Sequence, residues 1–581
     1  MLIAPSAAFS TQLRPRLHRG MVPQAFVAAF LTASAAAAPQ DDLVPVINSI
    51  RVEPAAAVRF LDRATFGASP EDVAFVSRRG YEAWIDAQLA LPPTLKLPPM
   101  EQFGCGPDQP GQTFDTCPGY DAVPHLTFLA QTWWTDALHA PDQLRQRVAF
   151  ALSEIFVVSD LNGTVQNFPS TFADYYDTLV RGAFTDYRTL LEDVTLHPSM
   201  GGYLSMARNR VEDPVLGTRP DENFAREVMQ LFSIGLQELR PDGSPVLDAA
   251  FQPIPTYDQS TITETARALT GWTYDDGLAP TTSLLDFLLK LPRVGAMIAW
   301  PAFHDAGPKT IVGGVALPGG AVPEEDLRAV LDALAAHPNA GPFLGKQLIQ
   351  RLVTSNPSPA YVTRITEVWN DDGSGVRGNL EAVVRAILLD PEALEGHVTL
   401  PQTFGKLREP VLKLTGLWRK FRATGEVTLT PLLADEFFGQ RPMGSPSVFN
   451  FFRPEYASPS LAAQRLVAPE LQIATHSKVT RTSNALTYFI AEGNTDLVPA
   501  TFNEPVMDLG YLKRRAHDVD EMVDLLDIRV LGGTMRAETR AALVLYLESL
   551  PYGVPGLPDG FLRAAESLLI LVVTPDYALQ R

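Results

Sequence analysis

At 581 residues the chain is long enough for two or more hydrophobic cores, or for one large domain with insertions. Its formal net charge of -19 places a surplus of acids on the surface, which argues against a nucleic-acid partner and against an anionic membrane surface. Solubility, cation binding and contact with neutral or basic partners are all compatible with this charge.

The segment 1–38 has the composition of an export signal. Three arginines precede the apolar run 21–31, and small residues follow up to Ala38, as signal peptidase requires. The alternative is a signal retained as an anchor, although the run is short and rich in alanine for a membrane span. We therefore expect a signal peptide at 1–38, a linker at 39–54, and an exported protein, periplasmic or extracellular, without stable membrane insertion.

Cys105 and Cys117 lie in a segment rich in Gly, Pro, Asp and Gln, and they are the only 2 cysteines of the chain. In an exported protein such a pair most simply forms a local disulfide that fixes a surface loop. Because no further Cys and no close His accompanies them, a metal site is disfavoured there.

Helical periodicity dominates the first half of the chain. Ser69 followed by Pro70 is typical of a helix start, and Gly80 is typical of a helix end. The spacing of apolar residues predicts helices at 55–66, 70–79, from Tyr81 onward, 126–139, 141–158, 186–196 and 221–235.

Between 273 and 323 the helical period fades and Gly, Pro and Thr accumulate. The runs 296–303 and 310–317 favour strands joined by His304–Lys309. Helices are predicted again at 324–337, 341–353, 359–369, 380–389 and 404–421. We expect a mainly α fold, a large multi-helix domain with a small β-hairpin insertion around 290–320. It forms a single domain over 55–581, or two lobes, 55–275 and 324–581, joined by the irregular or β segment 276–323.

The helix predicted at 221–235 carries an unusual polar stripe. Its apolar face is formed by Phe224 and Val228, while Asn223 and Glu227 lie about a quarter-turn away. So many hydrogen-bonding groups beside an apolar face suggest that another polar segment packs there.

Several blocks in one order carry a resemblance to a known family. They are RFLDRATFGASPEDV near the start, HPSMGGYL followed by ENFAREVMQLFSIG, ARALTGW, FHDAGPKTIVG, KLREP, GQRP and a closing LILVVTPDY. With these blocks the chain, from about residue 55 to 581, resembles the bacterial domain of unknown function 1800 family. The resemblance implies an exported, mainly helical protein, often encoded beside a sulfatase-like protein, and it carries no settled activity.

One departure from that family concerns the helix after the first arginine-rich turn. Many members carry a Trp-His-Asn-His run there, whereas this chain has Ala151, Leu152, Ser153 and Glu154. An acid/base or metal role of those histidines therefore does not transfer, and Glu154 alone does not restore it.

The ENFARE and HDAGPK blocks together contain the ingredients of acid/base chemistry. We assign as candidate catalytic residues Glu222, Glu227, His304 and Asp305. The candidate substrate-binding residues are Asn223, Arg226, Lys309 and Trp272. The alternative is a buried ion-pair network that joins the two blocks as an internal clasp.

The loop after the helix 359–369 has the oxygen spacing of a calcium-binding loop. Its candidate metal ligands are Asn370, Asp372, Ser374 and Glu381. Asn at the first position and the cation Arg377 within the loop weaken the match, and a plain polar turn between two helices is the alternative. Calcium is the one cofactor that the sequence suggests.

Two functions follow from these observations. The first is a hydrolase or lyase that acts on an extracellular or envelope polymer, preferably a glycan, with the helix carboxylates and the His-Asp turn. The second is a non-catalytic envelope or secreted scaffold that works with a sulfatase-like partner. The aromatic segment 447–456 fits either sugar stacking or the core.

Overall fold

Helix starts follow local capping signals in the computed structural model, which describes residues 51–102, 122–215, 217–275, 295–428, 430–494 and 504–581. Ser69 accepts a hydrogen bond from the backbone N–H of Asp72, and Pro70 occupies the first helical position, as predicted. The described residues belong to one compact unit, Asn48–Arg581. The expected signal segment and the predicted Cys105–Cys117 disulfide lie outside the described residues.

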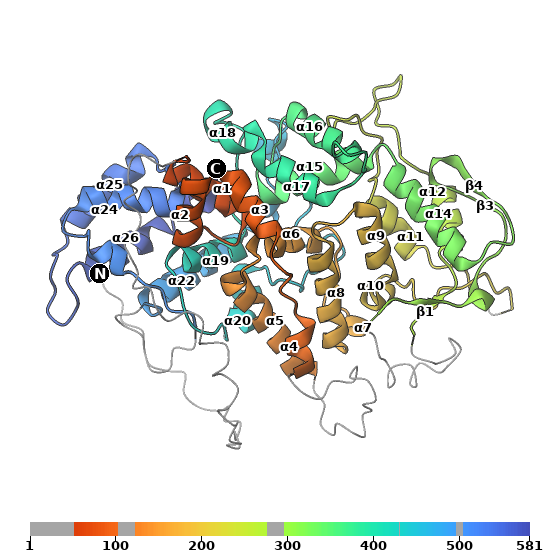
Figure 1. Cartoon of the computed structure of the whole chain (residues 1–581), viewed down its shortest axis with the longest axis horizontal. Helices are drawn as coiled ribbons and strands as arrows, with labels where there is room; N and C mark the ends of the chain where they lie inside the picture. Colours follow the sequence, from red (N-terminus) through yellow and green to blue (C-terminus); the bar gives the residue numbers. More distant parts are fainter. Residues whose placement is uncertain (1–50, 103–121, 216, 276–294, 429, 495–503) are drawn as a thin grey trace, which may run out of the picture. The chain divides into compact units, whose positions relative to one another are not determined.

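The fold is mainly α, as predicted (Figure 1). The helices up to residue 268 are α1 (Pro54–Ala64), α2 (Pro70–Arg79), α3 (Tyr81–Leu89), α4 (Leu97–Gln102), α5 (Ala122–His139), α6 (Gln143–Ser153), α7 (Gly163–Gln166), α8 (Pro169–Gly182), α9 (Tyr187–Leu196), α10 (Pro198–Tyr203), α11 (Asn223–Gln230) and α12 (Gln259–Ala268). The helices from residue 323 onward are α14 (Pro323–Ala336), α15 (Ala340–Leu352), α16 (Pro359–Asn370), α17 (Leu380–Leu389), α18 (Pro391–Thr399), α19 (Pro410–Lys420), α20 (Thr430–Phe438), α21 (Pro459–Ala462), α22 (His476–Ala491), α23 (Gly510–Lys513), α24 (Val519–Leu526), α25 (Ala537–Glu548), α26 (Phe561–Leu571) and α27 (Pro575–Ala578). Among the described helices, none combines the length and the apolar composition that crossing a bilayer requires.

Helix α8 lies in the centre of the core. All of its residues except Arg181 are buried, and it packs against α6 and α9. Its two buried acids have partners, since Asp177 accepts the backbone N–H groups of Lys96 and Leu97 at 2.6 and 2.8 Å. Hydrogen bonds of this kind allow acids to lie on a helix that is buried on nearly all sides.

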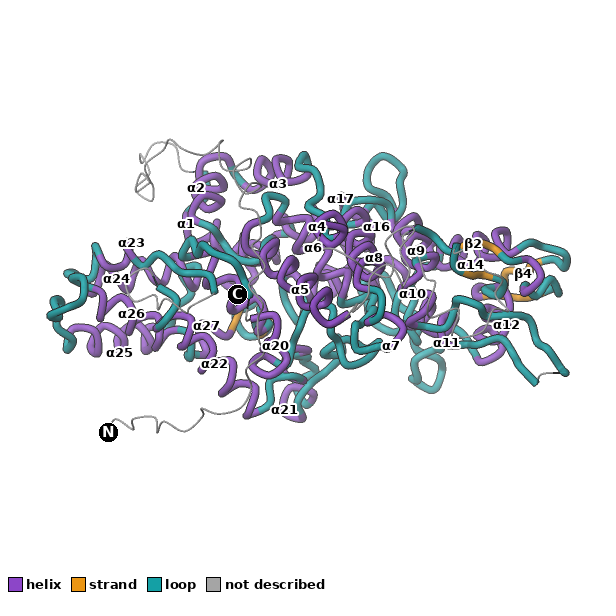
Figure 2. The backbone as a smooth tube through the Cα atoms, turned by 90° about the horizontal axis from the view of Figure 1, so that it is seen from below, coloured by secondary structure: helices purple, strands orange, loops and turns teal. Residues whose placement is uncertain are grey.

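The strands form small antiparallel pairs among the helices (Figure 2). The pairs join β1 (Trp272–Thr273) to β2 (Ile298–Ala299), β3 (Lys309–Ile311) to β4 (Val315–Leu317), and β5 (Lys406–Leu407) to β6 (Leu579–Gln580). In the last pair Lys406 lies opposite Gln580, whose side-chain amide donates to the carbonyl of Leu352 at 2.8 Å.

The predicted hairpin between 296–303 and 310–317 is wrong in its pairing, although a β-hairpin does lie within 290–320. Pro301 begins a 3-10 helix, Pro301–Phe303, which ends the first strand. The second run folds back on itself because Gly313 and Gly314 adopt positive φ angles of 73° and 72° and permit the tight turn of β3–β4.

The predicted helix 404–421 is wrong in its first part, because β5 precedes α19 there. Pro410 restricts Glu409 to an extended backbone, with φ of -58° and ψ of 142°, so the helix begins only at the proline. The helix predicted at 221–235 is shorter as well, but its turns continue to Gly235, which has a positive φ of 70° as its terminal position requires.

Candidate functional site

The turn His304–Lys309 is held by a buried carboxylate on α14. Asp326 Oδ2 lies 2.6 Å from Lys309 Nζ and 3.2 Å from His304 Nε2. Lys309 also donates to the carbonyl of Gly307 at 2.9 Å. Burial alone would raise the pKa of Asp326, but the bonds from His304 and Lys309 outweigh it and lower that pKa. We call His304, Lys309 and Asp326 the Asp326 clasp.

Asp305, the acid within the turn, forms an ion pair with Arg267 of α12. Arg267 donates to its two carboxylate oxygens at 2.7 and 3.1 Å and also to Glu264. The bonds from Arg267 hold the pKa of Asp305 below its usual value despite burial. His304 adds a hydrogen bond of 2.9 Å between Nδ1 and the carbonyl of Thr270. The ARALTGW and HDAGPK blocks are therefore joined by hydrogen bonds and an ion pair inside the protein.

Gly271 permits this close approach. A Cβ atom at this position would lie 2.9 Å from the Cβ of His304, and Gly271 has a positive φ of 87°. The neighbouring Trp272 is only 4% exposed, so the structure does not leave its ring free to stack on a ligand. Trp272 is thus a core residue, and its substrate-binding role stays a prediction.

Helix α11 bonds to a different part of α12. Glu222 accepts from Arg226 at 3.2 Å and from two side chains of α12, Gln259 and Thr263, each at 2.8 Å. Asn223 is exposed beside it. Since α12 packs against both α11 and β3, it separates the two predicted halves of the site. Among the described residues no hydrogen bond or ion pair joins the ENFARE block to the HDAGPK turn.

Glu227 differs from the other candidates because its carboxyl is not neutralised by a bonded cation. It is 6% exposed, and Oε2 has no hydrogen-bond partner. Burial raises its pKa. Burial and the nearby charge of Glu227 also raise the pKa of Tyr203 and of Tyr257 to about 12. Glu227 therefore holds its proton more tightly than an exposed carboxyl does.

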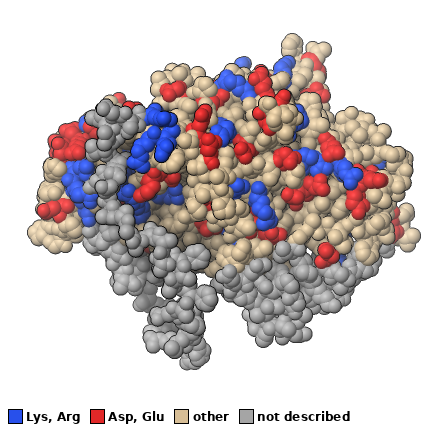
Figure 3. Space-filling model, in the orientation of Figure 1, with Lys and Arg blue, Asp and Glu red and all other residues tan. Residues whose placement is uncertain are grey.

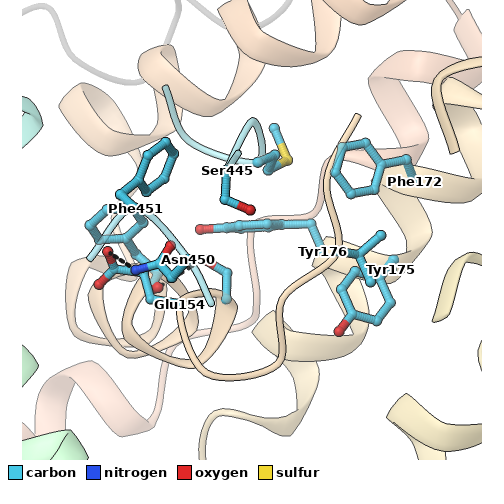
Figure 4. A pocket seen from close by; sticks show the side chains of 11 residues that line it. Glu154, Phe172, Tyr175, Tyr176, Ser445, Asn450 and Phe451 are labelled. Carbon is cyan, nitrogen blue, oxygen red and sulfur yellow. Dashed lines mark hydrogen bonds between the residues drawn. The ribbon is translucent and has the colours of Figure 1, made fainter. Parts of the chain in front are cut away.

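A second buried carboxylate, Glu154, lies at the end of α6 and faces a cavity (Figure 4). Asn450 donates to Glu154 Oε1 at 3.1 Å, and Arg351 donates to Oε2 at 3.2 Å. Asn450 adopts a positive φ of 62°, which asparagine tolerates better than most residues. The rings of Tyr175 and Tyr176 form another wall, and the cavity volume of ≈10 Å³ leaves room for about one water molecule.

Glu154 belongs to a network of buried charged side chains, which we call the Glu154 centre and which contains as many acids as cations. Lys406 lies 3.3 Å from Glu409 and 3.0 Å from Glu470, and all three side chains are at most 1% exposed. Burial and the charge of Glu409 raise the pKa of Glu154 to about 7, while Lys406 and further cations lower the pKa of Glu409. The members of the centre are Arg147, Glu154, Arg351, Lys406, Glu409 and Glu470.

Comparison with known proteins gives one match. The sequence model of the family described as Protein of unknown function (DUF1800) matches residues 59–578, which is nearly the whole chain. The chain belongs to this family. No curated protein and no solved structure matches it.

Two of the later DUF1800 blocks contribute to the Glu154 centre and its surroundings. KLREP contributes Lys406 and Glu409, and GQRP contributes Gln440, which donates to Glu409 at 2.6 Å. The next residue, Arg441, pairs with Asp160. These blocks therefore bind one another in the protein interior.

The calcium-like loop of this DUF1800 chain is bonded internally. Asp372 Oδ1 accepts the N–H groups of Ser374 and Val376 at 2.8 and 3.1 Å, and Arg377 donates to the side-chain oxygen of Asn370. Within the described part of the chain, no group of three or more His, Cys, Asp or Glu residues is arranged to hold a metal ion. Glu381 lies beyond the capping residue, Asn379, in the first turn of α17. Calcium binding by this loop stays a prediction.

The Glu154 centre is the feature that the sequence interpretation missed. Two features of the sequence pointed to it, namely Glu154 in place of a family histidine and the charged block KLREP. The pairing itself was not predictable, because Arg351 lies 197 positions from Glu154. The aromatic segment 447–456 is divided between core and surface, since Phe451 and Phe452 are 8% and 2% exposed whereas Phe449 is 44% exposed.

Proposed function

We propose that this protein is a non-catalytic, exported interaction protein that works with a sulfatase-like partner. The observation that carries the proposal is the Asp326 clasp. The side chains of His304, Lys309 and Asp326 are 2%, 0% and 2% exposed, and His304 and Lys309 each pair with Asp326. A catalytic acid or base must come within hydrogen-bond reach of its substrate, whereas these groups contact protein instead.

The surface charge supports the same proposal. Acidic and basic side chains are interspersed on the face shown in Figure 3, while the whole chain has a net charge of -19. Such a surface favours a neutral or basic protein partner over an anionic polymer, because like charges repel on approach.

The test is co-expression of the full chain with a sulfatase-like protein of the kind that the family resemblance implies as a neighbour. We expect the two proteins to co-purify at a fixed ratio and to associate reversibly in isothermal titration calorimetry. An unrelated sulfatase of similar size and charge serves as the control. Equal retention of both sulfatases, or of neither, would count against the proposal.

A second candidate function is the hydrolase or lyase on an envelope polymer, which one observation favours. Glu227 has an unpartnered carboxylate oxygen and a raised pKa, as a general acid requires at neutral pH. A panel of polysaccharides incubated with wild type and Glu227→Gln tests it. Polymer cleavage that disappears in Glu227→Gln, with an unchanged circular dichroism spectrum, would establish the enzyme and overturn the non-catalytic role.

A further inference from the structure

A cavity with a volume of ≈80 Å³ lies between α19, α22 and the end of α26. Aliphatic side chains form much of its wall, among them Ile473, Leu486 and Val572. At its rim Val479 and Val573 are 52% and 53% exposed, so the cavity is open to solvent. Its size and lining suit a small molecule with an apolar portion.

One cation in this cavity lacks a counter-ion. Lys413 lines the cavity, and the described residues provide no hydrogen bond or ion pair for its amine. Burial, followed by the charge of Arg408, lowers the pKa of Lys413 to about 8. At neutral pH the amine is therefore still mostly protonated, although it is held in an unfavourable environment.

The neighbouring acids are already engaged. Arg408 and Lys420 both pair with the same oxygen of Asp62, at 3.2 and 2.6 Å, so one negative charge serves two cations. Glu470 also lines the cavity, but its Oε1 pairs with Lys406 at 3.0 Å. Lys478, the remaining charged side chain of the wall, bonds to two backbone carbonyls. The cavity thus has an excess of positive charge.

Glu470 also presents an unused polar atom. Its Oε2 is buried and has no hydrogen-bond partner, and burial raises the pKa of this carboxyl. An amine without a counter-ion and an unpartnered carboxyl oxygen therefore line the same small, mainly aliphatic space.

We propose that this cavity binds a small aliphatic carboxylate, whose carboxylate group pairs with Lys413 and whose tail contacts the aliphatic wall. This binding site goes beyond the interaction role proposed above and does not depend on it. A charge-assisted hydrogen bond to the amine would supply the negative charge that the cavity lacks.

Isothermal titration calorimetry of the full chain with butyrate tests the site, with butyramide as the uncharged analogue of the same shape. We expect saturable binding of butyrate and at least tenfold weaker binding of butyramide. Lys413→Met keeps the length of the side chain and removes the amine, and it is expected to weaken butyrate binding at least about tenfold.

Lys346→Met is the matched control. Burial lowers the pKa of Lys346 as well, but this residue lies on α15 and does not line the cavity. We expect the Lys346→Met variant to bind butyrate with the affinity of wild type. Ala474→Leu, which fills the cavity without removing a charge, is expected to abolish binding and covers the case in which Lys413→Met does not fold.

The pH dependence of butyrate affinity tests the proposal on the wild-type protein. As pH rises above about 8 the Lys413 amine loses its proton, so butyrate binding is expected to weaken. Absence of saturable butyrate binding would overturn the proposal, and so would equal affinity for butyrate and butyramide. Unchanged binding by folded Lys413→Met would overturn it as well.

Discussion

Arg351 holds Glu154 at two points. One guanidinium nitrogen donates to the carboxylate Oε2 at 3.2 Å, and another donates to the backbone carbonyl of Glu154 at 2.8 Å. Both side chains are at most 5% exposed. A single arginine from α15 therefore fixes both the charge and the backbone at the end of α6.

Replacement of this arginine is expected to destabilise the protein strongly. Arg351→Met removes the guanidinium that donates to both the carboxylate and the backbone carbonyl of Glu154, and loss of one partner of a buried pair typically costs about 3–5 kcal/mol. Urea denaturation measures the change. Arg385→Met is the control, since Arg385 pairs with Asp86 at the surface, where ion pairs contribute about 0–1 kcal/mol. Similar losses in the two variants would show that the Glu154 pair is not important for stability.

The raised pKa of Glu154 makes stability depend on pH in a defined direction. The folded-state pKa is about 7, because of burial first and the charge of Glu409 second. An unfolded glutamate titrates at about 4.3. Between these values the folded chain binds the proton that the unfolded chain releases, so this group makes stability fall as pH rises.

The variant Glu154→Gln removes that titration. Melting temperatures are measured from pH 5 to pH 8. The melting temperature of the variant relative to that of wild type is expected to increase as pH rises to about 7. Glu436→Gln, at an exposed pair with Arg481, is expected to give a constant difference. A constant difference for Glu154→Gln would contradict the assigned pKa.

The Asp326 clasp predicts a stability effect as well. Lys309→Met removes the amine that lies 2.6 Å from Asp326 and leaves a buried carboxylate with one weaker partner, His304. We expect a loss of about 3 kcal/mol or more in unfolding free energy. Glu222→Gln, in the half-exposed pair with Arg226, is expected to lose less than about 1 kcal/mol. Equal denaturation midpoints for Lys309→Met and wild type would be evidence against the clasp.

Glu227→Gln is expected to stabilise the protein, in contrast to Lys309→Met. Burial disfavours the ionised carboxyl of Glu227, and its Oε2 has no partner to lose. The neutral amide should therefore raise the melting temperature by about 1–2 °C, and more at pH 8 than at pH 5. Differential scanning calorimetry at both pH values measures this. A lower melting temperature at pH 8 would indicate that Glu227 is stabilising in its ionised form.

The loop after α16 is expected to be insensitive to chelation. Protein donors already bond to Asn370 and to both oxygens of Asp372, including the side-chain amide of Asn379 at 2.8 Å. EDTA should leave the melting temperature unchanged, and elemental analysis after dialysis should find no calcium in fixed ratio. Stoichiometric calcium with a higher melting temperature would instead confirm the loop as a metal site.

The helices could be predicted because their signals are local. Ser69 and Pro70 lie within one turn of the helix that they begin, and Pro410 marks the start of α19 in the same way. The predicted hairpin failed because the strand partner of Ile298 is Thr273, across a stretch that no periodicity describes. Pairing of strands only two or three residues long is decided by the packing around them.

The sequence identified charged blocks that form internal contacts, but it did not indicate which blocks contact each other. The turn His304–Lys309 does bind a charged helix, yet its partners are Arg267 on α12 and Asp326 on α14. Charge and spacing identify residues that need a partner, but they do not specify which distant residue supplies it. The same limitation applies to Glu154, because one sequence contains many arginines and only the fold selects Arg351.

The pairing of β6 with β5 affects how the protein is made. Gln580 lies opposite Lys406, a buried member of the Glu154 centre. This strand pair therefore joins segments far apart in the sequence, and it forms only after the chain between them has been synthesised.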